Sequence, residues 1–208
     1  MNFDLRENAV EQTSYKAFGA SIDHYHAILA HLSTYFNGSI IIDMGTHRGG
    51  SAAALSYNKS NEVYTFDITP QEEAVELFKE DEYKNITYII GNCIENNWHG
   101  QPLGPFSTNL SEPLKSEKEI FLSSELIFLD IDPHDGIQEA QVLDFLIENN
   151  YKGIMVCDDI GHQHPPMHDW WESIELPTYT IRNKYAALKG TGIICFNDQE
   201  ILSDARVS

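Results

Sequence analysis

Two segments decide the fold of this chain: Leu126-Ile-Phe-Leu-Asp130-Ile-Asp132-Pro-His134-Asp135 and Ile154-Met-Val-Cys-Asp158-Asp159. Each begins with a short apolar run and ends in clustered carboxylates, which is typical of a buried parallel strand that carries acids at its carboxyl end. Ligands of α/β proteins bind in the crevice beyond those strand ends. Carboxylates that meet there repel one another unless a cation or a shared proton lies between them. The two segments therefore predict a metal-assisted enzyme.

The composition is that of a folded, strongly acidic protein. Of the 208 residues, 42% are hydrophobic, and 13 Lys and Arg stand against 32 Asp and Glu, for a formal net charge of −19. A nucleic-acid backbone or an anionic membrane requires a basic face on its partner, so we expect neither as a partner. The three cysteines show no C-x-x-C spacing and do not suggest a disulfide framework.

The N-terminus carries no apolar signal core, and no stretch approaches the length of a membrane span. We therefore expect a cytoplasmic protein. The length suits a single domain, with a helical segment at 1–37 and an α/β core at 38–208.

Apolar patterns of strand and helix type alternate along the chain. Expected strands cover 39–43, 63–67, 86–90, 125–129, 154–157, 178–182 and 192–196. Expected helices cover 21–36, 51–57, 70–82, 136–149 and 170–174, with turn-rich or loop segments at 96–119 and 161–168. This alternation predicts an α/β fold with a mostly parallel sheet, in which the last two strands pair antiparallel.

A glycine-bearing loop joins the first core strand to the next helix: Asp43-Met-Gly45-Thr46-His-Arg-Gly49-Gly50-Ser51. Its G-x-x-x-G-G spacing matches neither the dinucleotide-binding fingerprint nor the phosphate loop of nucleoside triphosphatases. An acid before the loop disfavours a pyrophosphate and suits an amine or a sulfonium. Asp67 ends the following strand, at the position from which a carboxylate accepts from ribose hydroxyls. A lone glycine loop is only a turn, but with both acids it indicates a nucleoside-type ligand.

The D-x-G-x-x-x-G-G-S loop and the acid of the second strand resemble the S-adenosylmethionine (SAM) motifs of class I methyltransferases. The segment T-H-R-G-G-S is similar to the G-V-W-R-G-G-S loop of the macrocin and novobiocin deoxysugar O-methyltransferases. The resemblance covers roughly residues 38–160 and implies a single Rossmann-like domain, with a seven-stranded, mostly parallel sheet and an antiparallel C-terminal strand. By this resemblance the cofactor-binding residues are Asp43, Gly45, Thr46, Gly49, Gly50, Ser51, Asp67, Asn92, Cys93 and Asp130. Asp43, Gly45 and Ser51 would line the methionine side, Asp67 would hold the ribose, and Asn92 and Cys93 would contact adenine.

The two acidic segments resemble the metal-binding strands of cation-dependent O-methyltransferases. The resemblance makes Asp130, Asp158 and Asp159 the ligands of Mg²⁺ or Mn²⁺, which prefer oxygen donors. Catechol-type members carry a lysine base where this chain has Pro133, whereas Asp132 matches the acid that deoxysugar members use as general base. In an alternative interpretation, these aspartates only cap the helices that follow.

The predicted function is therefore SAM- and Mg²⁺-dependent O-methylation of a sugar hydroxyl, with Asp132 as general base and His134 as a substitute base. The expected partner is a small-molecule or glycan acceptor, and a homo-oligomer is left open. A catechol or phenol acceptor is the first alternative. A phosphatase of the haloacid dehalogenase type and a non-enzymatic SAM-binding domain are alternatives of other classes. Trp170 and Trp171 are interpreted as either sugar-site walls or packing residues, and Lys184 and Lys189 receive no role.

Overall fold

The computed structural model describes residues 2–20, 24–90, 118–186, 189–197 and 200–202. The predicted adenine contacts Asn92 and Cys93 lie outside these residues, as does the turn-rich segment 96–119 apart from its last two positions. In the described part of the chain, no helix is long and apolar enough to span a membrane.

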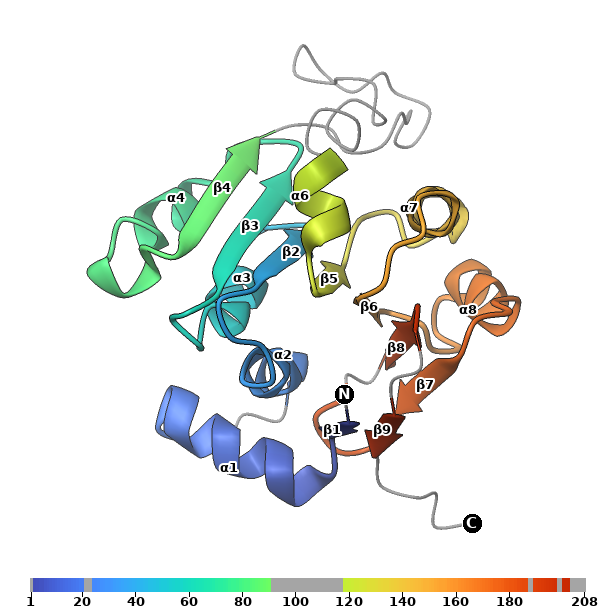
Figure 1. Ribbon diagram of the computed structural model, residues 1–208, viewed down its shortest axis with the longest axis horizontal. Coiled ribbons are helices and arrows are strands. Elements are labelled where there is room, and N and C mark those ends of the chain that lie inside the picture. The colour runs from blue at the N-terminus through green and yellow to red at the C-terminus, as the bar shows by residue number, and fades with distance from the viewer. Residues whose placement is uncertain (1, 21–23, 91–117, 187–188, 198–199, 203–208) are drawn as a thin grey trace.

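A seven-stranded sheet forms the centre of the molecule, in the order β4-β3-β2-β5-β6-β8-β7 (Figure 1). Its strands are β2 (Ile40–Met44), β3 (Glu62–Asp67), β4 (Ile86–Ile90), β5 (Leu126–Leu129), β6 (Ile154–Asp158), β7 (Thr178–Ile181) and β8 (Thr191–Cys195). The first five are mutually parallel, whereas β8 runs antiparallel to both β6 and β7. The predicted α/β fold is confirmed, including the antiparallel pairing of β7 with β8.

Helices cover both faces of this sheet (Figure 1). They are α1 (Glu7–Phe18), α2 (Tyr25–Ser33), α3 (Gly50–Leu55), α4 (Glu72–Leu77), α6 (Lys118–Ser123), α7 (Ile137–Glu148) and α8 (Pro165–Glu172), with a 3-10 turn η1 (Asp81–Tyr83). Because successive strand residues point to opposite faces, β5 serves two cores. Leu126 and Phe128 pack with α1 to α3, while Ile127 and Leu129 pack with α6 to α8. Burial on both faces explains why β5 reads as an uninterrupted apolar run.

The register of the central strands brings the acidic segments together. Leu129 of β5 aligns with Cys157 of β6, so Asp130 follows one strand beside Asp158, the last residue of the other. Met44 of β2 aligns with Leu129 on the other side of β5, which places the start of the glycine loop at the same edge. The parallel pairing therefore gathers the predicted site residues at the carboxyl edge of the sheet.

Three predicted helices have wrong boundaries. The helix expected at 170–174 begins at Pro165, inside the expected loop 161–168. Proline is tolerated there, because it has no N–H group and the N–H groups of the first helical turn have no partner within the helix. The helix expected at 21–36 covers only Tyr25–Ser33 among the described residues. The helix expected at 70–82 covers only Glu72–Leu77, and the separate 3-10 turn η1 lies within the rest of that range.

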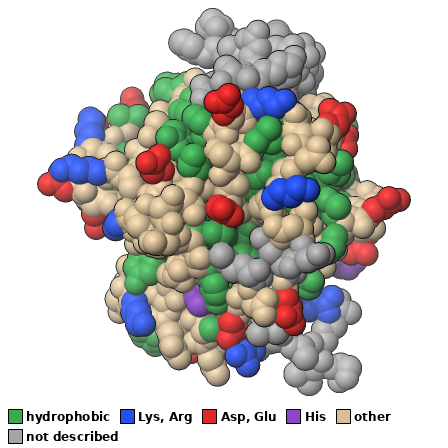
Figure 2. All heavy atoms as spheres, in the orientation of Figure 1, with side chains coloured by type: hydrophobic (Ala, Val, Ile, Leu, Met, Phe, Trp, Pro, Cys, Tyr) green, Lys and Arg blue, Asp and Glu red, His purple; other side chains and the backbone are tan. Residues whose placement is uncertain are grey.

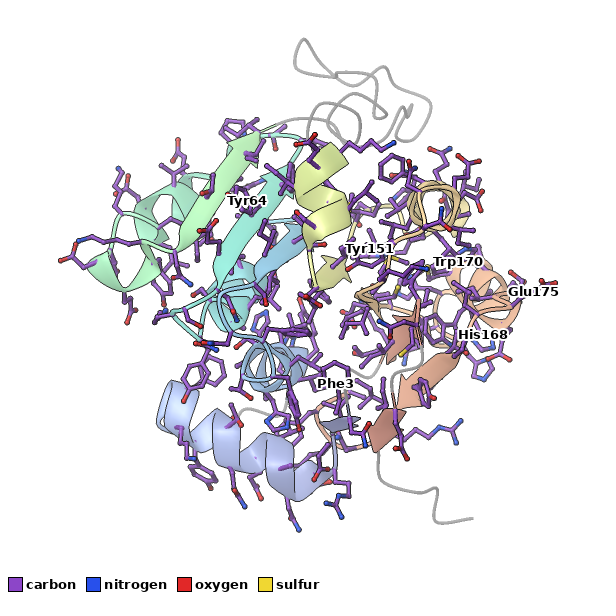
Figure 3. All side chains as sticks on the ribbon, in the orientation of Figure 1. Phe3, Tyr64, Tyr151, His168, Trp170 and Glu175 are labelled. Atoms are coloured by element: carbon purple, nitrogen blue, oxygen red, sulfur yellow. The ribbon has the colours of Figure 1, made fainter. Side chains whose placement is uncertain are left out.

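The N-terminal segment packs on the core through a small second sheet that the sequence does not predict. Its strands β1 (Asn2–Asp4) and β9 (Glu200–Leu202) pair in parallel, and three-residue strands are too short to show a periodic pattern. Phe3 is fully buried against the rings of Tyr35 and Phe36, and Figure 3 shows it beside α2.

Acidic side chains are spread over the face drawn in Figure 2, with lysines and arginines between them.

Candidate active site at the carboxyl edge of the sheet

The glycine loop between β2 and α3 lies directly on the end of β5. Gly45 has φ +101°, and a Cβ at this position would overlap the backbone carbonyl oxygen of Asp130. Gly49 has φ +87°, and its Cβ would lie 2.9 Å from Cζ of Phe78. Only glycine fits at these two positions, because each combines a left-handed backbone with a close neighbour. The loop predicted to bind the cofactor and the end of the strand predicted to bind the metal are therefore in direct contact.

The backbone of the glycine loop is held by β3. The N–H groups of Gly45 and Thr46 both donate to the carbonyl oxygen of Phe66, at 2.9 and 3.1 Å. The N–H of His47 donates to Oδ2 of Asp67 at 2.8 Å. Asp67 thus fixes the loop and remains half-buried at the sheet edge. A carboxylate has about four acceptor sites, so this one retains capacity for a ribose hydroxyl, which stays a prediction.

Asp43 lies beneath the glycine loop and is fully buried. Its Oδ2 accepts from the hydroxyl of Thr65 at 2.5 Å, and Thr65 is in turn 2.6 Å from Oγ1 of Thr46. Burial raises the pKa of Asp43 to about 7, against the opposing effect of hydrogen bonds from Thr65 and Ser51. Among the described residues Oδ1 of Asp43 has no hydrogen-bond partner. An unpaired buried carboxylate oxygen fits the predicted contact with a cationic ligand, although Asp43 has no solvent exposure of its own.

Three carboxylates meet where β5 and β6 end. Asp158 is buried, and its Oδ1 accepts from the hydroxyl of Thr191 on β8 at 3.0 Å. Burial, together with the charges of Asp130 and Asp159, raises the pKa of Asp158 to about 7. The pKa of Asp130 is also raised by burial and by Asp159, against the opposing charge of His134 and a hydrogen bond from Tyr25. Because β5 and β6 are neighbours and His134 lies within 3.9 Å of both Asp130 and Asp159, we treat Asp130, Asp158 and Asp159 as one acidic cluster.

Asp159 has two carboxylate oxygens in different surroundings. Its Oδ2 lies 3.0 Å from Nζ of Lys189, 3.3 Å from Nε2 of His134 and 3.6 Å from Nε2 of His164. Its Oδ1 is buried and has no hydrogen-bond partner in the described part of the chain. The hydrogen bond to Asp159 raises the pKa of Lys189, so the ammonium stays charged. Positive or donor groups therefore surround one oxygen of Asp159, while the other has no partner among the described residues.

The two predicted bases differ in exposure. The side chain of Asp132 is 73% exposed, whereas that of His134 is 13% exposed. Nε2 of His134 lies 3.4 Å from Oδ1 of Asp132, 3.3 Å from Oδ2 of Asp159 and 3.9 Å from Oδ1 of Asp130. His134 and Asp159 both have positive φ, 57° and 59°, which is uncommon for residues other than glycine. The imidazole therefore connects the exposed Asp132 to the partly buried Asp130 and the buried Asp159.

The acidic cluster suits a divalent cation in its chemistry, although its side chains are not already arranged around one. Three carboxylates are hard oxygen donors of the kind that Mg²⁺ and Mn²⁺ prefer, and the unpaired Oδ1 of Asp159 is a free ligand atom. Among the described residues, no group of three or more His, Cys, Asp and Glu is spaced to hold a metal ion as it stands. A cation held by Asp130, Asp158 and Asp159 would need a shift of these side chains.

Sequence reasoning missed residues that other elements bring to the site. The hydroxyl of Tyr25, in the first turn of α2, donates to Oδ2 of Asp130 at 3.2 Å across 105 positions of sequence. Glu139 in α7 is 1% exposed, and among the described residues no donor meets either of its carboxylate oxygens in good hydrogen-bond geometry. Burial raises the pKa of Glu139 to about 7. No local pattern signals Tyr25. A turn at Lys189 was predicted, but only the pairing of β8 with β6 places that lysine beside Asp159.

The aromatic pair of α8 does not act as a unit. Trp171 is 3% exposed and belongs to the core, where its indole N–H donates to Thr180 at 3.3 Å. Trp170 is half-buried and packs on the turn before α7, since a Cβ at Gly136 would lie 2.7 Å from Cβ of Trp170. Figure 3 shows Trp170 and His168 on α8. Of the two predicted interpretations, packing is therefore confirmed for Trp171.

Comparison with solved structures identifies the fold. The chain is similar to a cofactor-bound protein from MTB (14% identity, TM-score 0.57), with 91% of this chain and 88% of that chain covered. It is also similar to an SAH-bound methyltransferase from Podospora anserina (14%, 0.51), with 92% and 88% covered. A candidate caffeoyl-CoA O-methyltransferase from Staphylococcus aureus matches as well (14%, 0.56), with 82% and 81% covered. No protein-family model and no curated protein sequence matches the chain.

The chain thus shares with these solved structures a Rossmann-like α/β fold built on a mostly parallel seven-stranded sheet. The glycine loop and the acidic cluster lie at the edge of the sheet where such α/β folds bind their ligands.

Proposed function

We propose that this protein is a SAM- and Mg²⁺-dependent O-methyltransferase that acts on a sugar hydroxyl. The observation that carries the proposal is the contact of Gly45 in the glycine loop with the backbone of Asp130. Through this contact, the loop predicted to hold the methyl donor lies against the cluster predicted to hold the acceptor hydroxyl. Methyl transfer needs the two reactants in line and in contact, and such positioning supplies up to about 7–11 kcal/mol in ideal intramolecular models.

The residues of the loop account for donor binding. SAM carries its methyl group on a positively charged sulfonium, which favours an acidic site. Asp43 and Asp67 supply two carboxylates at the ends of adjacent strands, and the unpaired Oδ1 of Asp43 faces no competing donor among the described residues. Similarity to a SAH-bound methyltransferase supports this assignment.

The acidic cluster accounts for acceptor activation. A divalent cation bound by Asp130, Asp158 and Asp159 would lower the pKa of a hydroxyl that contacts it. Asp132 is exposed and takes the proton of the hydroxyl at Oδ1. Nε2 of His134, 3.4 Å away, receives the proton from Asp132 or takes it directly, and Oδ2 of Asp159 stabilises the resulting imidazolium at 3.3 Å. The pair of His134 and Asp159 thus resembles a base and the acid that orients it.

The proposed acceptor is a neutral sugar or glycan. By the resemblance, catechol-type enzymes carry a lysine base at the position that is Pro133 in this chain. The net charge of −19 disfavours nucleic acid and other anionic partners. A catechol or phenol remains the second candidate, supported by the similarity to the candidate caffeoyl-CoA O-methyltransferase. The phosphatase alternative gives the glycine loop no role, although this loop contacts the cluster directly.

Calorimetric titration of SAM into the metal-stripped protein, repeated with Mg²⁺ and with D43A and D130A, tests the proposal. We expect D43A to lose SAM binding and D130A to lose Mg²⁺ binding. Transfer of labelled methyl groups to a panel of glycosides and catechols then separates the two acceptor classes. Absence of SAM binding by the wild-type protein would refute the methyltransferase assignment.

A further inference from the structure

Lys189 contacts the acidic cluster and has no part in the proposed proton transfer. Its ammonium lies 3.0 Å from Oδ2 of Asp159, and the side chain of Asp159 is only 3% exposed. The lysine side chain is 51% exposed, so its charge reaches the buried carboxylate from the solvent side. A lysine in this position supplies one positive charge to a cluster of three acids.

The backbone holds Lys189 in this place. The N–H of Gly161 donates to the carbonyl oxygen of Lys189 at 2.5 Å, and the N–H of Ile160 donates to that of Gly190 at 3.3 Å. Gly190 has φ +90°, so the turn before β8 bends back toward the segment that follows Asp159. Because Lys189 and Asp159 lie on two segments joined by hydrogen bonds, the ion pair is built into the fold.

A divalent cation bound at Asp159 would share a carboxylate with this lysine. The lysine and two imidazoles surround Oδ2, while the buried Oδ1 has no partner among the described residues. Two positive charges at one carboxylate repel each other, and the repulsion is strong where solvent is excluded. A cation that draws on both oxygens of Asp159 therefore gains affinity when the ammonium moves away, which the exposure of Lys189 permits.

We propose that Lys189 is a tethered counter-ion that competes with the divalent cation for Asp159 and is displaced when the cation binds. This inference rests on the cation-binding part of the proposed function. Without a cation, the lysine lowers the repulsion among Asp130, Asp158 and Asp159 and keeps them folded at the sheet edge. With a cation, the freed ammonium leaves the cluster, so the lysine sets the affinity for the metal.

Mn²⁺ binding provides the test, measured by the loss of the free-ion electron paramagnetic resonance signal in the absence of SAM and acceptor. Wild-type protein is compared with K189Q, which removes the competing charge. K184Q serves as the matched control, since it removes a lysine whose ammonium pairs with Glu11 of α1 at 2.8 Å. We expect K189Q to bind Mn²⁺ about tenfold more tightly than wild type, which corresponds to loss of one competing ion pair, and K184Q to bind as wild type does.

A second readout follows folding in the absence of metal. In the presence of a chelator, K189Q should melt at a lower temperature than wild type, and saturating Mn²⁺ should remove most of this difference. Equal or weaker Mn²⁺ binding by K189Q, with binding by the wild type intact, would overturn the competition and leave the proposed function standing. If neither protein binds Mn²⁺, the competition and the cation part of the proposed function both fail, while the SAM titration still tests the methyltransferase assignment.

Discussion

Substitution of Gly45 by alanine tests the contact on which the proposed function depends. A left-handed backbone costs an L-residue about 1–2 kcal/mol, and Gly45 has φ +101°. The new Cβ would also overlap the carbonyl oxygen of Asp130, and overpacking of this kind typically costs about 1–3 kcal/mol more. The Asp130 backbone cannot yield easily, because its N–H is bonded to Met44 at 3.0 Å. We therefore expect G45A to lower the free energy of unfolding by about 2–5 kcal/mol.

Gly38 provides the matched control for this substitution. It has φ +68°, but a Cβ there would meet no atom within 4 Å, so G38A keeps the backbone cost and lacks the overlap. Urea unfolding of the two variants should place G38A about 1–2 kcal/mol below wild type and G45A further below. SAM titration should show weakened binding for G45A alone, because the loop moves away from β5. If G45A matches G38A in stability and binds SAM as wild type does, the reasoning from the Gly45 contact is refuted.

Substitutions at three further positions test the electrostatics of the site. Burial raises the pKa of Glu139 from 4.5 to about 7, so the wild-type protein loses stability as the pH rises between these values. E139Q should therefore unfold with a free energy up to about 3 kcal/mol higher than wild type at pH 8, with little difference at pH 4. An equal gain at both pH values in urea unfolding would contradict this. T65V removes the hydrogen bond to buried Asp43 and should cost about 1–3 kcal/mol at pH 8, whereas T65S should retain most of the stability; equal losses in thermal melts would show that the hydroxyl is not responsible. D67N should weaken SAM binding about tenfold. Its stability should change little, because the asparagine side-chain oxygen can still accept from the N–H of His47. Unchanged affinity by calorimetry would remove Asp67 from the cofactor site.

The local pattern of the chain predicted the fold well. The apolar runs at β5 and β6 are buried on both faces, and their acids lie at the same edge of the sheet as expected. Helix ends were predicted less well, as the early start of α8 at Pro165 shows. A helix end depends on which backbone groups find partners outside the helix, and such partners leave no periodic signal.

The sequence by itself determined the order along the chain of the seven strands of the central sheet, the glycine loop and the convergence of the carboxylates, because a buried strand shows as a run of consecutive apolar residues. It did not predict β1, β9 or α6. Only the tertiary structure decided what surrounds those acids. Tyr25 reaches Asp130 across 105 positions, and Lys189 reaches Asp159 because β8 returns antiparallel beside β6. These contacts depend on strand register and on how distant segments pack, and neither is encoded in any single stretch of the chain. The positive charge of Lys189 beside Asp159 therefore follows from the tertiary structure and could not be predicted from the local sequence.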